Sequence, residues 1–190
     1  MGATRNQDST HNVGERISWT NRPPISVRPE VMDAKMGLES ANLKWNTRRE
    51  NMQDVCEACH TVEYVGNFYI QYDSMIELYN EKFAKPGKAL YGTAKPLLKK
   101  AKFSNKLDWI WFELWHHEGR RARMATSMMA PDYTHWHGMY EVAENFYHEF
   151  LPELMRLAEK NGKKPVFDEA VNAILAKPEH EWYRNNGGAR

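Results

Sequence analysis

The chain has 190 residues, of which 42% are hydrophobic and 27% are charged, and these proportions are ordinary for a globular protein. Its formal net charge of +1 gives no reason to expect nucleic acid or an acidic membrane surface as a partner. The sequence contains no apolar run long enough to cross a bilayer, so no membrane span is predicted.

Residues 1–45 are expected to form an extended arm that holds a partner chain. Pro23, Pro24 and Pro29 disfavour helix in the residues before them, although a short helix is possible over 29–40. A flexible tail is the alternative. The apolar side chains that could anchor the arm on another surface are Ile17, Trp19, Ile25 and Val27.

Helical spacing begins at Trp45. One helix is predicted over 45–59, and a second, longer helix starts at His60 and ends at the segment 85–87, where Pro86 stops it. The apolar positions of the second helix recur every three or four residues, at Val62, Val65, Tyr69, Tyr72, Ile76 and Tyr79. A lysine-rich connection follows over 87–104, with a short helix at 94–101 and the lysines in solvent.

Two further long helices are predicted over 105–129 and 133–160. Pro131 is expected to interrupt the chain between them, and Asp132 to cap the second of the two. Pro152 is expected to kink this helix, because proline removes a backbone hydrogen bond. Its apolar face is predicted at Trp136, Tyr140, Ala143, Phe146, Phe150, Leu154 and Leu157.

The end of the chain is expected to be simpler. Asn161 and Gly162 form a helix stop, a short helix is possible over 168–176, and the tail over 185–190 is expected to be disordered. No strand is predicted, so the fold class is all-α and built from long helices. The predicted domains are an arm (1–45), a helical domain (46–160) and a C-terminal tail (161–190).

Residues 56–60 have the sequence CEACH, which predicts that the helical domain over 46–160 is haem-binding and that its long helices pack around a c-type haem. Cys56 and Cys59 are three positions apart and His60 follows directly, which is the attachment pattern of a c-type haem. Each thiol adds to one vinyl group of the porphyrin, and the imidazole binds the iron as proximal ligand. The chain has two cysteines in all, so a zinc site with two cysteine pairs is excluded. A redox-active dithiol remains as an alternative.

A six-coordinate haem iron needs a second axial ligand. The histidines considered for this role are His116, His117, His135, His137 and His148. Neighbouring helical residues point about 100° apart, so at most one of each pair should face a given iron. His117 lies on the apolar side of its helix and His137 precedes Gly138, so these two are favoured and His116 is third.

Four other side chains are candidates for a role near a haem. Arg120, Arg121 and Arg123 could bind haem propionates or the carboxylates of a partner, because guanidinium pairs with carboxylate through two parallel hydrogen bonds. A solvated basic face is the alternative. Tyr133, next to Asp132, is interpreted from its chemistry alone as a tyrosine near a helix cap.

Three stretches resemble the C-terminal part of the octahaem hydroxylamine oxidoreductase family. They are YNEKFAKP at 79–86, WHHEGRRAR at 115–123 and MMAPDYTHWHGMYE at 128–141, and the CEACH site resembles the last haem motif of that family. The resemblance covers roughly residues 45–157. It implies a trimeric, haem-packed helical protein in which His60 is the proximal ligand of the last haem. It also implies that histidines of the 116/117 and 135/137 pairs are distal ligands.

The resemblance further implies a role for Tyr133, with Tyr140 as the second choice. In the oxidising members a tyrosine from this region is covalently bonded to the catalytic haem of a neighbouring subunit. Members without the bond are thought to work reductively. Tyr133 is therefore expected to be catalytic, with plain packing as the alternative.

The chain departs from the family in one large respect, because it has one haem motif where the family has eight. It is therefore either a fragment or a small subunit that pairs with a larger multihaem cytochrome c chain. The expected assembly is a trimer-based hetero-oligomer that exchanges electrons with a soluble acceptor or donor. Covalent haem is attached outside the cytoplasm, so an extracytoplasmic location is expected, although no signal peptide is visible.

Two functions from different classes follow. In the first, the chain is a haem subunit that carries electrons from the oxidation of hydroxylamine or a related nitrogen compound. In the second, it belongs to a complex that reduces nitrite, nitric oxide or hydroxylamine, or it serves only in electron transfer and assembly. The substrate and the direction of the reaction stay open at this point.

Overall fold

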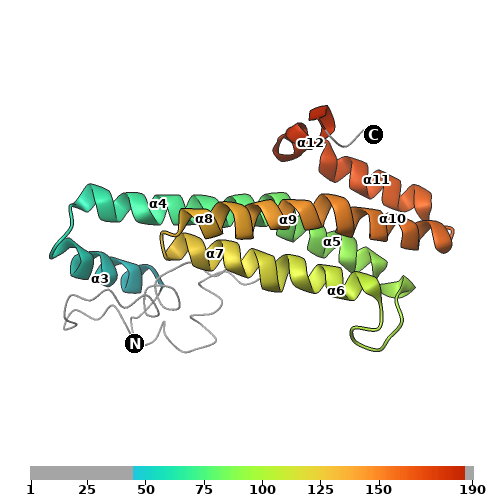
Figure 1. Cartoon of the computed structure of the whole chain (residues 1–190), viewed down its shortest axis with the longest axis horizontal. Helices are drawn as coiled ribbons and strands as arrows, with labels where there is room; N and C mark the ends of the chain where they lie inside the picture. The colour runs from blue at the N-terminus through green and yellow to red at the C-terminus, as the bar shows by residue number, and fades with distance from the viewer. Residues whose placement is uncertain (1–44, 187–190) are drawn as a thin grey trace. The chain divides into compact units, whose positions relative to one another are not determined.

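The computed structural model describes residues 45–186, and Figure 1 shows their helices. Every regular element in this range is a helix, and the range contains no strand, which confirms the all-α prediction. None of these helices is long and apolar enough to cross a membrane. The predicted arm, apart from Trp45, lies outside the described residues, and so do residues 187–190 of the tail that was predicted to be disordered.

The described residues form two compact units. Unit 1 contains residues 45–78 and 122–134, and unit 2 contains residues 79–121 and 135–186. Each unit is described by itself below.

Unit 1 contains α3 (Trp45–Glu57), most of α4 (Val62–Tyr79), the end of α7 (Gly119–Ser127) and α8 (Pro131–Thr134). The two helices predicted over 45–59 and from His60 are therefore present. The buried face of α4 matches the predicted spacing at four positions in this unit and also includes Phe68. The prediction for Val62 was wrong: its side chain is 64% exposed, because it opens the helix beside an exposed turn. The buried α4 side chains of this unit are Val65, Phe68, Tyr69, Tyr72 and Ile76.

Arg49 joins α3 to α4. Its guanidinium donates two hydrogen bonds to the Asp73 carboxylate, at 2.7 Å and 3.0 Å. The same group lies over the rings of Tyr69 and Trp45, at 4.5 Å and 5.1 Å from their centres. Two parallel hydrogen bonds combined with stacking need the planar guanidinium, which lysine cannot replace.

Unit 2 is a succession of α-helical, π-helical and 3-10 segments. Its core contains large aromatic and aliphatic side chains that are almost completely buried: Tyr79, Phe83, Leu90, Leu107, Leu114, Val142, Phe146, Phe150 and Leu154. The segments, in chain order, are η2 (Asn80–Ala84), α5 (Lys85–Ala94), η3 (Lys95–Leu97), α6 (Lys106–Phe112), η4 (Glu113–Glu118), η5 (His135–Tyr140), α9 (Glu141–Glu144), η6 (Asn145–Phe150), α10 (Leu151–Lys160), α11 (Lys164–Leu175), η7 (Pro178–His180) and α12 (Glu181–Asn186).

Pro86 does not end a helix, contrary to prediction. The π-helical segment η2 comes directly before α5, and the N–H of Lys85 bonds to the carbonyl of Asn80, five residues back. A π turn already changes the register of the hydrogen-bond ladder, so the missing N–H of proline falls where the α-helical pattern is interrupted. The helix predicted over 94–101 was therefore placed too late, since α5 ends at Ala94.

The same arrangement recurs around Pro152. Segment η6 is π-helical, and the N–H of Leu151 bonds to the carbonyl of Phe146. Pro152 then occupies the first turn of α10, a position where proline is tolerated because no intrahelical N–H is needed. Trp136 and Tyr140, predicted on the apolar face of this helix, are instead 60% and 55% exposed.

The boundary predictions around the other turns were partly correct. Asn105 starts α6 as expected, and its backbone N–H bonds to the Asp108 carboxylate at 3.2 Å. Pro131 is the first residue of α8, a favoured site for proline, so Asp132 lies within the first turn and does not cap it.

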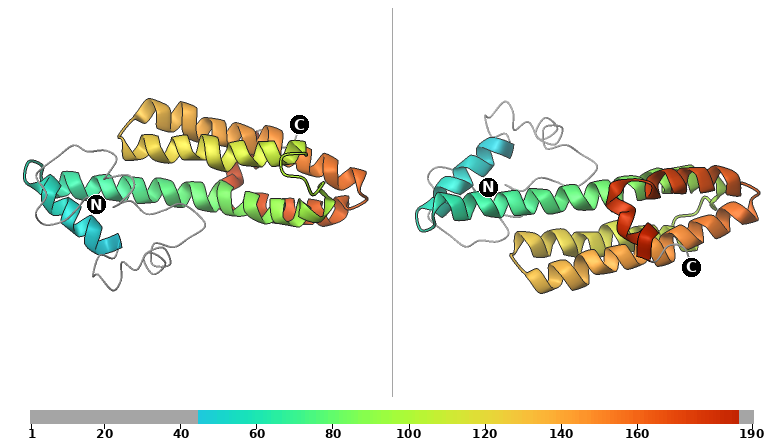
Figure 2. Two further views of the ribbon diagram at one scale, coloured as in Figure 1. Left: turned by 90° about the horizontal axis from the view of Figure 1, so that it is seen from below. Right: turned by 90° about the horizontal axis from the view of Figure 1, so that it is seen from above.

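The C-terminal helices differ in extent from the prediction. Gly162 has φ +65° and follows the end of α10, as the helix stop requires. Helix α11 begins at Lys164, earlier than predicted, and folds back against α10 and α5 (Figure 2). Helix α12 extends to Asn186, into the segment that was predicted to be a disordered tail.

Tyr79 and Gly119 depend on each other in unit 2. The Tyr79 side chain is fully buried, and its hydroxyl donates a hydrogen bond to the Trp115 carbonyl at 3.4 Å. A Cβ atom at Gly119 would overlap the hydroxyl end of the Tyr79 ring. Gly119 is therefore required by packing, because only a residue without a side chain leaves room for the tyrosine.

We predict that Gly119→Ala lowers the free energy of unfolding by about 1–3 kcal/mol, because the added methyl group forces the buried ring to move. Gly92→Ala is the matched control, since a Cβ at this helical position would meet nothing within 4 Å. It should be neutral or stabilising by up to about 1 kcal/mol. Denaturant unfolding measures both, and equal effects would contradict the packing role of Gly119.

His180 is a buried histidine that is kept neutral. Its side chain is inaccessible to solvent, and its Nδ1 lies 2.7 Å from the Tyr147 hydroxyl. Burial lowers the pKa of His180 to about 4, and the positive charge of Lys82 adds to the effect. In the unfolded chain, in contrast, the pKa of this imidazole is about 6.5.

We therefore predict an acid-dependent loss of stability that comes from His180. Between pH 7 and pH 5 the unfolded state takes up the proton and the folded state does not, so the free energy of unfolding falls by about 2 kcal/mol. His180→Asn should remove this part of the difference between the two pH values. His148→Asn, at an exposed position, should leave it unchanged, and the reverse result would exclude His180 as its source.

Candidate functional site

The CEACH motif spans the last two residues of α3 and the start of the turn that leads to α4 in unit 1. The backbone N–H groups of Cys59 and His60 both donate to the Cys56 carbonyl, at 3.1 Å and 3.0 Å. No disulfide joins the two cysteines. The motif therefore presents two thiol side chains and an imidazole within a short stretch of backbone.

The surroundings of this turn are apolar on one side and open on the other. Cys56 is half-buried and packs against two clusters of buried side chains. Cys59 is exposed, and so is His60, whose ring stacks on Tyr64 with the centres 4.8 Å apart. The residues of the two clusters are Met52 and Val55, and Val65, Phe68 and Tyr69.

This donor set fits a covalently attached haem. Such a haem would need two thiols, a nearby imidazole and apolar side chains beside the porphyrin edge, and the motif has residues of each kind. Cys56, Cys59 and His60 are the residues that would hold the group. Among residues 45–186, no group of three or more His, Cys, Asp or Glu side chains is arranged to hold a metal ion.

The two histidine pairs lie in π-helical segments of unit 2. His116 and His117 belong to η4, and His135 and His137 belong to η5. The two segments contact each other. Single π turns inside helices are frequent at functional sites, and unit 2 brings two of them together with a histidine pair in each.

The two histidines of η4, His116 and His117, differ in their environment. The His116 ring stacks on Phe112, with the centres 4.5 Å apart and the planes at 18°, and it meets the Trp115 ring edge-on. His117 is exposed. His116 is thus already part of an aromatic cluster, whereas the side chain of His117 faces solvent.

His137 is oriented by a carboxylate. Its Nδ1 lies 3.2 Å from Glu141 Oε1, one helical turn further along the chain. Glu141 in turn forms an ion pair with Arg121 at 2.6 Å. Histidines that bind metals are commonly held in this way, by a carboxylate on the ring nitrogen that does not bind the metal.

Glu118 and Asn145 form a partly buried polar cluster close to the ion pair of Arg121 and Glu141. The Asn145 amide donates to Glu118 Oε1 at 3.3 Å. Burial raises the pKa of Glu118 to about 7, and the carboxylates of Glu113 and Glu141 contribute to the rise, although the Asn145 hydrogen bond opposes it. Four buried atoms here have no hydrogen-bond partner among the described residues: Glu118 Oε2, Asn145 Oδ1, Arg121 Nε and Glu141 Oε2, the last of which is in the ion pair with Arg121.

Parts of the three stretches on which the resemblance depends contact one another in unit 2. Tyr79, from the first stretch, packs against Gly119 of the second, and Arg121 of the second pairs with Glu141 of the third. Segments that are far apart in the sequence thus meet within this unit.

The remaining predicted residues lie outside this cluster. Tyr133 belongs to α8 in unit 1 and is 53% exposed. Arg120 is exposed at the start of α7. Glu118, Glu141 and Asn145 were not predicted as site residues. The spacing of four residues between His137 and Glu141 was the signal that could have identified Glu141.

Comparisons with protein-family models, with curated proteins and with solved structures found no match to this chain. Its functional interpretation therefore depends on its motifs and on the geometry of the described residues.

The environment of the two thiols leads to a prediction about their reactivity. Exposed Cys59 should react faster with a thiol reagent than half-buried Cys56. Arg49→Ala should accelerate the reaction of Cys56 by about fivefold or more, because it releases α3 from α4 and favours local opening. Mass spectrometry of the labelled peptides separates the two sites.

Arg156→Ala is the control for this experiment. Arg156 pairs with Glu153 on the surface of unit 2 and is largely exposed, so its loss should leave both thiols unaffected. An Arg49 variant with an unchanged Cys56 rate would show that this ion pair does not hold the motif in place.

Proposed function

We propose that the chain is a c-type haem subunit of a multihaem complex that resembles hydroxylamine oxidoreductase. The observation that carries the proposal is the CEACH motif, in which two cysteines and an imidazole lie close together beside apolar side chains. The family assignment depends on the resemblance of the three stretches and of the CEACH motif in the sequence.

Cys56 and Cys59 are proposed to hold one haem through thioether bonds, with His60 as its proximal ligand. When bound, this group supplies a one-electron carrier. The protein's own contribution is to place the thiols within one turn and to cover one porphyrin edge with the side chains around Cys56.

His137 and His117 are proposed as axial ligands for haems of a partner chain. The Glu141 carboxylate next to Nδ1 of His137 supports Nε2, the opposite ring nitrogen, as the proposed iron ligand. Glu141 is itself held by Arg121. His117 is preferred to His116 because the ring of His116 already stacks on Phe112.

Arg121 is also proposed to bind a haem propionate. Its Nη2 faces Glu141, while its Nε is buried and has no hydrogen-bond partner among the described residues. A buried guanidinium N–H without a partner is unfavourable, and a carboxylate from a bound group would satisfy it. Arg120, which is exposed beside it in the sequence, is proposed to contribute in the same way.

Tyr133 is proposed to reach the catalytic haem of a partner chain. Its side chain is 53% exposed, so it is accessible to another subunit. The complex would oxidise hydroxylamine or a related nitrogen compound outside the cytoplasm and pass the electrons to a soluble acceptor. The small subunit would not contain a complete active site by itself.

The haem proposal predicts the product of expression in a host that attaches c-type haem. The chain should retain one haem after denaturation, detected by its absorbance and by intact mass. Cys59→Ser should lower the yield of stable attachment, because one thioether bond is lost. The double variant Cys56→Ser with Cys59→Ser should carry none.

Arg156→Ala, far from the motif in sequence, is the control and should retain the haem. Wild-type chain that emerges from the same host without haem, and with its cysteines free or joined in a disulfide, would refute the proposal. The chain would then be better described as a dithiol protein.

A further inference from the structure

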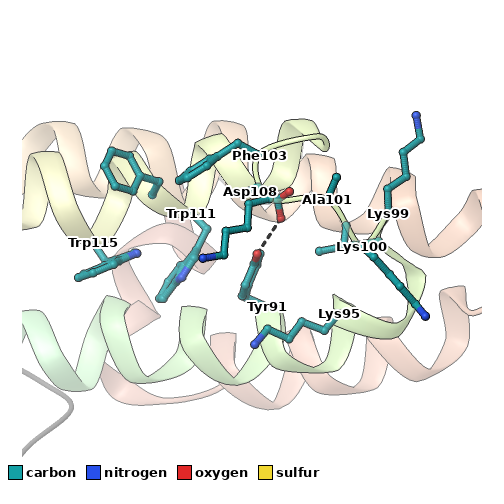
Figure 3. A pocket seen from close by; sticks show the side chains of 12 residues that line it. Tyr91, Lys95, Lys99, Lys100, Ala101, Phe103, Asp108, Trp111 and Trp115 are labelled. Atoms are coloured by element: carbon teal, nitrogen blue, oxygen red, sulfur yellow. Dashed lines mark hydrogen bonds between the residues drawn. The ribbon is translucent and has the colours of Figure 1, made fainter.

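A cavity of about 490 Å³ lies in unit 2, between the end of α5, the connection to α6, and the α6–η4 helix. Figure 3 shows Trp115, Trp111 and Tyr91 in succession along it. Phe112 and Phe103 complete its aromatic lining. This volume is within the usual range of small-molecule sites, and aromatic walls are typical of them.

The aromatic wall is held in position by neighbouring groups. The rings of Tyr91 and Trp111 stack with their centres 5.7 Å apart and their planes at 16°. The Tyr91 hydroxyl donates to Asp108 at 2.7 Å, drawn as a dashed line in Figure 3. Trp111 also packs so closely on Gly87 that a Cβ there would lie 2.6 Å from the indole.

The connection that forms the rim is held at both ends by side chains of α6 and its cap. Asn105 bonds to the backbone N–H and the carbonyl of Lys99, at 3.0 Å and 3.1 Å. The indole N–H of Trp109 donates to the Phe103 carbonyl at 3.0 Å. Phe103 has φ 55°, a conformation uncommon for a residue with a large side chain. Such strain is concentrated at binding sites.

The charge around the cavity is strongly unbalanced. Four lysines line it, and Asp108 is the one acidic residue among them. Asp108 already accepts hydrogen bonds from Tyr91 and from Asn105, so it is engaged within the protein. The lysines, all exposed, are Lys95, Lys99, Lys100 and Lys102.

We propose that this cavity binds a small planar aromatic anion, of the class in which a flat ring system carries a phosphate. The ring would lie against Trp111 and Trp115, because aromatic faces bind flat rings regardless of their substituents. The phosphate would meet the ammonium groups of the rim. An aliphatic anion would leave the aromatic wall unused, and a neutral ring would leave the lysines unused. The proposal does not depend on haem.

The test uses three probes on the full chain: flavin mononucleotide, riboflavin and pyrophosphate. Flavin mononucleotide has the ring and the phosphate, riboflavin has the ring without the phosphate, and pyrophosphate has the charge alone. Quenching of flavin fluorescence by the tryptophans reports binding of the first two, and calorimetry reports pyrophosphate. We expect flavin mononucleotide to bind at least about tenfold more tightly than either of the others, because it alone combines a ring that stacks with a phosphate that meets the lysines.

Variants of exposed lysines measure the contribution of the rim charges to binding, and a variant of Trp115 measures that of the aromatic wall. Lys99→Gln with Lys100→Gln should weaken flavin mononucleotide about tenfold and leave riboflavin unchanged. Lys160→Gln with Lys163→Gln removes the same charge from exposed positions that do not line the cavity, and it should have no effect. Trp115→Leu should weaken both flavins.

Three results would overturn the proposal. The first is no binding of flavin mononucleotide at millimolar concentration, and the second is binding of pyrophosphate as tight as that of flavin mononucleotide. The third is equal loss of affinity in the two lysine variants, which would indicate general charge attraction and not a site at this cavity.

Discussion

The backbone register of unit 2 depends on π-helical turns, in which each N–H bonds to the carbonyl five residues back. Four such segments lie among the described residues, and all of them belong to this unit. Segments η2 and η6 come directly before the helix starts that contain Pro86 and Pro152. Segments η4 and η5 contain the two histidine pairs. If a π turn were replaced by regular α-helix, all later side chains would rotate about the helix axis and point in other directions. The positions of the two prolines and of the two histidine pairs therefore depend on the π-helical register.

The sequence predicted the helical class and most helix locations correctly, because apolar spacing of three and four residues is a strong signal. It could not predict that the chain continues through Pro86, since the π turn that accommodates this proline is stabilised by tertiary packing around Phe83 and not by a local residue preference. The same limit explains Trp136 and Tyr140. Their faces were assigned with an α-helical period, and the segment that contains them is π-helical.

For the candidate site, the sequence identified the residues whose chemistry is distinctive and missed those whose role comes from a neighbour. Cys56, Cys59 and His60 are close together in the sequence, so their spacing alone is enough to identify the motif. Glu118 and Glu141 are ordinary helical carboxylates until Asn145 and Arg121 are brought to them across the unit. Their importance depends on contacts between distant segments, which a single sequence does not contain.

The half-burial of Cys56 has a consequence for the order of events during maturation. Its sulfur packs against side chains of both α3 and α4, whereas the sulfur of Cys59 is open to solvent. A bulky group that reacts with both thiols would therefore meet resistance at Cys56 while Arg49 holds α3 against α4 through Asp73. The packing of α3 thus makes the two sulfur atoms of the motif unequal, with one accessible in the folded chain and the other reached fully only when α3 separates from α4.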